Sequence, residues 1–91
     1  MRRQNDKMSG NLERDLREET LKWLERAESL FSEISGRNQF IENISAYISD
    51  SKYFLEKGDL IRAFEAVIWA WAWIEIGMEI GVLIKREPNS S

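Results

Sequence analysis

The side chains that most often carry catalysis are scarce in this chain. Its 91 residues include no His and no Cys, so the commonest general base, the commonest nitrogen ligand of metals and all thiolate sites are missing. Glu75 and Glu79 stand one helical turn apart, as paired carboxylates do in helical di-metal proteins. Those sites also take His from a Glu-x-x-His spacing, which this chain lacks. We therefore expect no enzyme activity, no metal and no other cofactor.

Three of the four tryptophans lie in one uncharged run, Ala66 to Ile74. This run is less than half of the roughly 20 residues that a membrane-spanning helix needs, so we expect no membrane insertion. Tryptophans can stack on bases or hold an apolar ligand. Aromatic residues at helical spacing are nevertheless more often part of a core. We therefore expect the run to lie in a helix that contributes to the core.

Apolar residues recur at helical spacing in three successive segments, which predicts an all-α, up-and-down three-helix bundle. The predicted helices run from about 11 to 35, from about 40 to 57 and from about 60 to 85. Asn11 is placed to cap the first helix. We expect a single domain over residues 11–86, between a flexible N-terminal arm at residues 1–10 and a flexible C-terminal tail at residues 87–91.

The link between the second and third predicted helices is short. Gly58 is expected to take the left-handed conformation that ends a helix, and Asp59 to cap the helix that follows. So short a connection predicts a tight hairpin with the two helices antiparallel and adjacent.

The third predicted helix carries two apolar stripes, each with alternating spacings of four and three residues. The first comprises Leu60, Phe64, Val67, Trp71, Ile74, Met78 and Gly81, and the second Ala66, Trp69, Trp73, Ile76, Ile80 and Leu83. At about 100° per residue the stripes lie roughly 160° apart. Either the other two helices cover both stripes, or part of the second stripe stays exposed for a partner. We expect the latter, with an interface at Trp69, Trp73, Ile76, Ile80 and Leu83.

Gly77 and Gly81 also lie in this predicted helix, where each costs about 1 kcal/mol relative to Ala. One reason for them is the close approach of another helix. The alternatives are that they make room for the tryptophan rings, or that they weaken the helix towards its end.

The charge balance bears on the kind of partner. The net charge is −3, which disfavours nucleic acid as a ligand. The start Met1-Arg2-Arg3-Gln4 is not followed by the apolar core of a signal peptide, and we expect a cytoplasmic protein.

The hairpin carries a resemblance. The run Tyr53-Phe54-Leu55-Glu56-Lys57-Gly58-Asp59, followed by Ala63-Phe64-Glu65-Ala66 and by Trp69-Ala70-Trp71-Ala72-Trp73, resembles an archaeal family of short proteins of unknown function, DUF357. The resemblance implies a three-helix bundle and brings no catalytic residues with it. The turn also looks like that of a tetratricopeptide unit, but a stacked array needs at least three units and the chain holds one.

These observations predict a non-catalytic helical interaction module. Its expected partner is a second copy, in a homodimer, or another protein, bound through one face of the third helix. The competing hypothesis is a small-ligand, nucleotide or RNA-binding domain that uses the tryptophan cluster.

Overall fold

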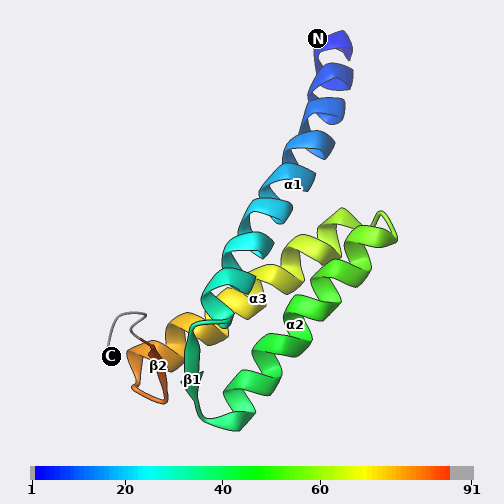
Figure 1. Ribbon diagram of the computed structural model, residues 1–91. Helices are drawn as coiled ribbons and strands as arrows, with labels where there is room; N and C mark the ends of the chain where they lie inside the picture. The colour runs from blue at the N-terminus through cyan, green and yellow to red at the C-terminus, as the bar shows by residue number, and fades with distance from the viewer. Residues whose placement is uncertain (1, 87–91) are drawn as a thin grey trace.

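The computed structural model describes the backbone of residues 2–86 and the side chains of residues 11–86. Three helices and a small two-stranded sheet make up the fold (Figure 1). In chain order the elements are α1 (Arg2–Phe31), β1 (Ile34–Gly36), α2 (Asn38–Glu56), α3 (Leu60–Glu79) and β2 (Leu83–Lys85). The helices run up and down, which confirms the predicted all-α three-helix arrangement.

The hairpin between α2 and α3 forms as predicted. Gly58 has φ +79°, the left-handed region that glycine adopts without strain. The Asp59 carboxylate accepts a hydrogen bond from the backbone N–H of Arg62 at 3.2 Å, so it caps α3. The two helices pack side by side along their length, as a three-residue link requires.

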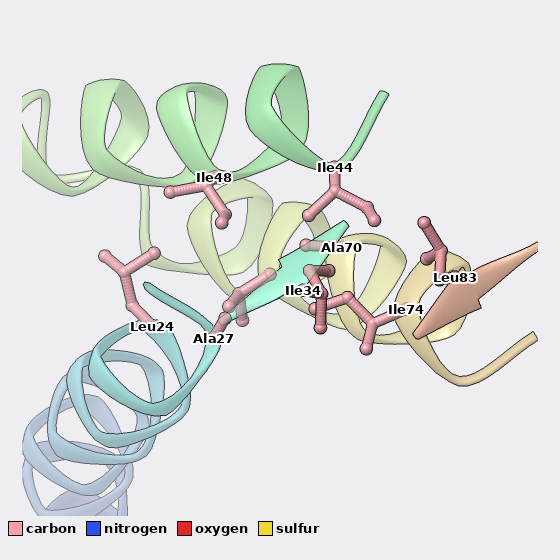
Figure 2. Packing of buried hydrophobic residues seen from close by; sticks show 9 residues of the cluster. Leu24, Ala27, Ile34, Ile44, Ile48, Ala70, Ile74 and Leu83 are labelled. Carbon is pink, nitrogen blue, oxygen red and sulfur yellow. The ribbon is translucent and has the colours of Figure 1, made fainter. Parts of the chain in front are cut away.

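The core lies where α1, α2 and α3 meet. Figure 2 shows Ile44 and Ile48 of α2 facing Ala70 and Ile74 of α3. The buried cluster comprises Leu24, Ala27, Ile34, Ile44, Ile48, Val67, Ala70, Ile74 and Leu83. Small side chains on α3 bring α2 close, and two strand residues close one end of the cluster.

Helix α1 is longer than predicted at its start and shorter at its end. The predicted start at a capping Asn11 is wrong, because the helical backbone begins at Arg2. Asn11 lies within the helix, where its side-chain oxygen accepts a hydrogen bond from Arg14. The predicted arm thus continues α1 over residues 2–10, and Met1 lies outside the described residues. Residues 2–10 have no apolar periodicity, which was the signal used for the prediction, so these turns were missed.

Helix α3 ends earlier than predicted. It stops at Glu79, because Gly81 has φ +82° and the Val82 N–H donates to the Gly77 carbonyl oxygen at 3.0 Å. The predicted helical stretch to Lys85 is therefore wrong. Leu83–Lys85 instead forms β2, which pairs antiparallel with β1, Ile34 lying opposite Lys85. The predicted C-terminal tail, residues 87–91, lies outside the described residues.

The molecule is elongated, with principal extents of 57 × 24 × 22 Å. The C-terminal half of α1 packs on α3, whereas its N-terminal half diverges from the hairpin and extends beyond it (Figure 1). Thr20, Leu24 and Ala27 are buried on the packed half, while Leu12 is exposed on the diverging half. The position of α1 decides which side of α3 stays open to solvent.

Candidate interaction surface

Helix α3 is packed on two neighbouring sides. Its buried residues are Leu60, Ala63, Ala66, Val67, Ala70, Ile74 and Gly77. On the side that faces α1, Trp71 meets Trp23 edge to face, with ring centroids 5.7 Å apart. On the side that faces α2, Trp73 meets Phe40 in the same manner at 4.8 Å. Neither helix covers the third side.

That third side is apolar and open. We call it the outer face and define it by Ile61, Ile68, Trp69, Ala72, Ile76 and Ile80. Ile61 is 75% exposed, Ile76 54% and Ile80 60%, while Trp69 is 51% exposed. Single exposed apolar residues are ordinary on proteins, but several along one helix face are typical of a surface that another molecule covers.

The structure places the predicted interface residues in two groups. Trp69, Ile76 and Ile80 lie together on the outer face. Trp73 is half-buried at its edge, because Phe40 covers one side of the ring. Leu83 is only 2% exposed and belongs to the core, since the chain turns at Gly81 and β2 directs this side chain inward. Leu83 therefore has no place on the outer face.

Sequence reasoning missed Ile61, Ile68 and Ala72. They fall between the two predicted stripes, so neither spacing pattern contains them. A signal was present, because Ile61 and Ile68 are seven residues apart and Ala72 follows four residues later. These three residues widen the exposed part of the second stripe into a face that Glu65 and Glu79 interrupt.

The tryptophans form separate contacts instead of one cluster. The Trp71 indole N–H donates to the Trp23 carbonyl oxygen at 3.0 Å, which fixes α1 against α3. Trp69 stacks on Tyr47 of α2, with centroids 6.1 Å apart and planes at 20°. One face of the Trp69 ring is thus taken by Tyr47. The arrangement holds the helices in position and leaves Trp69 partly available to a partner.

Carboxylates interrupt the outer face: Glu65 and Glu79 lie on it, and Glu75 lies at its edge. Glu65, Glu75 and Glu79 are exposed along α3, and Arg62 is the cation nearest the start of the helix. Arg62 lies 3.7 Å from Asp59 and over the Phe54 ring. Within the residues that the structure describes, no group of three or more acidic side chains has the geometry of a metal site.

A notch of about 300 Å³ lies beside the outer face. Its lining residues are Trp23, Ile68, Trp71, Ala72 and Glu75. The notch exists because Ala72 carries only a methyl group between larger neighbours. It forms a depression beside the outer face into which a partner's side chains can fit.

The Glu19 carboxylate on α1 accepts two side-chain hydrogen bonds. Hydrogen bonds from Lys22 and from the Trp23 indole N–H hold the pKa of Glu19 below its ordinary value. These bonds orient the Trp23 ring that meets Trp71. Glu19 therefore supports the packing of α1 and is not part of the outer face.

No helix in the described part of the chain combines the length and the apolarity that crossing a bilayer demands. The exposed apolar residues of α3 are interspersed with Glu65, Glu75 and Glu79, which such a helix would have to bury.

Comparisons with known proteins agree with the resemblance of the hairpin. The family model described as "Protein of unknown function (DUF357)" matches residues 10–83. The crystal structure of protein AF1782 from Archaeoglobus fulgidus, assigned to the same family, matches with a TM-score of 0.80 and 66% sequence identity. The match covers 81% of this chain and 97% of that one. The curated proteins contain no match. The three-helix chain with the Gly58–Asp59 hairpin and the open side of α3 therefore belongs to the DUF357 family.

Proposed function

We propose that this protein is a non-catalytic interaction module that binds a second copy of itself through the outer face of α3. The observation that carries the proposal is the burial pattern of α3. The helix is packed on two sides by α1 and α2, yet Ile61, Trp69, Ile76 and Ile80 are each at least half exposed on the third. Covering such side chains is the usual source of affinity between proteins.

The size of the outer face fits a reversible dimer. Five large apolar side chains, each 45% to 75% exposed, offer on the order of 500 Å² per chain, or about 1,000 Å² in a symmetric pair. That total is near the lower limit for a specific interface, so we expect association that depends on concentration in the micromolar range. Trp69, the single tryptophan on this face, is the expected centre of the binding energy.

A charge introduced at the centre of the outer face tests the proposal. Ile76→Glu places a carboxylate where the partner's apolar side chains would lie, and burial of an unpaired charge costs several kcal/mol. We expect this variant to be monomeric at concentrations at which the unaltered protein is dimeric, as measured by sedimentation velocity. Because Ile76 is 54% exposed and lies outside the core cluster, helical content and unfolding should change little.

Leu21→Glu is the matched control. Leu21 is 49% exposed but lies on α1, so the substitution makes the same chemical change away from the outer face. This variant should associate like the unaltered protein. Equal association of both variants would show that the outer face is not the interface.

A titration separates this proposal from ligand binding. Nucleotides and single-stranded RNA are added while tryptophan fluorescence is recorded at two salt concentrations. We expect no saturable change, because Tyr47 already occupies one side of Trp69 and three carboxylates lie on the face or at its edge. A saturable change that weakens with salt would instead favour stacking and phosphate contacts.

A further inference from the structure

We infer that two copies of α3 pack antiparallel across a twofold axis near Ala72. This inference rests on the proposed self-association and specifies its geometry. In a closed twofold pair each residue of the face meets either its own copy or a residue equally distant from the axis. The orientation therefore determines which side chains of the two copies contact each other.

The side chains favour an axis near Ala72. Ala72 has the smallest side chain of the outer face and lies four residues from both Ile68 and Ile76. The distance between two packed helices is set by the side chains at their crossing, so the closest approach is at a small residue. An antiparallel pair centred there places Trp69 of one copy near Ile76 of the other. The notch beside Ala72 adds the space that these larger side chains need.

The charges favour the antiparallel orientation over the parallel one. Towards the end of α3 the face carries only the acidic Glu75 and Glu79, whereas its start carries Asp59 and Glu65 together with the cation Arg62. A parallel pair would bring the two ends with Glu75 and Glu79 together, so that four carboxylates would meet at the negative ends of two helix dipoles. An antiparallel pair places those carboxylates at the positive dipole end of the other helix, within reach of Arg62, and also sets Glu79 level with Glu65 of the other copy. It therefore has fewer carboxylates at each negative dipole end than the parallel pair.

Single-cysteine cross-linking tests the orientation, because the natural sequence has no Cys. A disulfide requires Cα atoms within about 7 Å of each other. In the antiparallel pair, Cys at position 72 lies near its own copy, whereas Cys at position 80 lies about 24 Å from its copy along the helix. Position 80 instead comes level with position 64 of the partner, so position 65 is displaced from it by one residue, about 1.5 Å along the helix. Glu65 and Ile80 are both exposed, so their replacement leaves the core intact.

The full-length variants Ala72→Cys, Glu65→Cys and Ile80→Cys are each oxidised alone, and the last two also as a mixture in which one chain carries a mass tag. Leu21→Cys, on α1, is the control for random collisions. We expect a covalent dimer from Ala72→Cys and a tagged heterodimer from the mixture. The Glu65→Cys and Ile80→Cys chains alone should cross-link no more than the Leu21→Cys control.

The outcomes separate the orientation from the proposed function. Self-cross-linking of Ile80→Cys together with Ala72→Cys would show a parallel pair, which overturns the orientation and leaves the self-association standing. A dimeric mass with no cross-link at position 72 would place the contact elsewhere and overturn both. A monomeric mass for the uncross-linked protein would overturn the self-association itself.

Discussion

At the scale of single residues, the described structure satisfies its buried polar groups. Thr20 and Ser51 are fully buried. The Thr20 hydroxyl donates to the Leu16 carbonyl oxygen at 2.7 Å, within α1. The Ser51 hydroxyl donates to the Ala63 carbonyl oxygen at 2.8 Å and so joins α2 to α3. A buried hydroxyl without a partner would cost stability, so Ser51 fixes the distance between the two helices.

Ser51→Ala removes this link. We expect the free energy of unfolding to fall by about 1 kcal/mol, the usual net value of one buried hydrogen bond. Urea denaturation followed by circular dichroism measures the change. Ser49→Ala, at an exposed position on the same helix, is the control and should have little effect. An equal loss in both variants would mean that the serine acts through helix propensity and not through its bond to α3.

The lowered pKa of Glu19 predicts that the stability of the fold depends on pH. This pKa is held below the ordinary value of 4.5 by the bonds from Lys22 and Trp23. A carboxyl with a lowered pKa stabilises the fold above pH 4.5, and this contribution is lost as the pH falls through the folded-state pKa. Stability measured above and below pH 4.5 should therefore fall less in Glu19→Gln than in the unaltered protein. The control Glu18→Gln, which leaves both bonds in place, should retain the full decline.

Local capping chemistry was sufficient to predict the residues of the hairpin. Gly58 and Asp59 act through their own backbone and their nearest neighbours, so the sequence around them contains the whole cause. The placement of Leu83 was not predictable in this way. Its spacing continues the apolar stripe of α3, and only the turn at Gly81 and the pairing of β2 with β1 bring it into the core.

At the scale of elements, the end of α3 depends on the space that Gly77 leaves. A methyl group on Gly77 would come within 2.7 Å of the Leu83 Cγ atom and 3.0 Å of the Phe40 ring. Gly77 is thus explained by the return of β2 and by the approach of α2. The predicted alternatives, accommodation of tryptophan rings or a weakened helix end, do not describe this contact. Gly81 does end the helix, through its positive φ.

Gly77→Ala tests this account. Helix propensity alone would stabilise the variant by about 1 kcal/mol, whereas overpacking costs about 1 to 3 kcal/mol. We expect a net loss of about 1 kcal/mol in thermal or urea unfolding. In a Leu83→Val background the side chain is shorter and the close contact is relieved, so the same substitution should become neutral or stabilising. An identical loss in both backgrounds would contradict the proposed contact with Leu83.

At the scale of the whole molecule, the periodic pattern predicted the number and order of the helices, but not how α1 lies on the hairpin. Amphipathic spacing indicates that a side chain is buried, but it does not indicate which element buries it. The two stripes of α3 allowed either complete coverage or an open side. The structure leaves that side open, because α1 and α2 pack on adjacent sides of α3. We propose that a second copy covers this side.

Light scattering across a concentration series tests that proposal most directly. The account predicts a mass that rises from 10.7 kDa towards twice that value as the concentration passes through the micromolar range. A mass of 10.7 kDa at every concentration, up to high micromolar, would contradict self-association through the outer face.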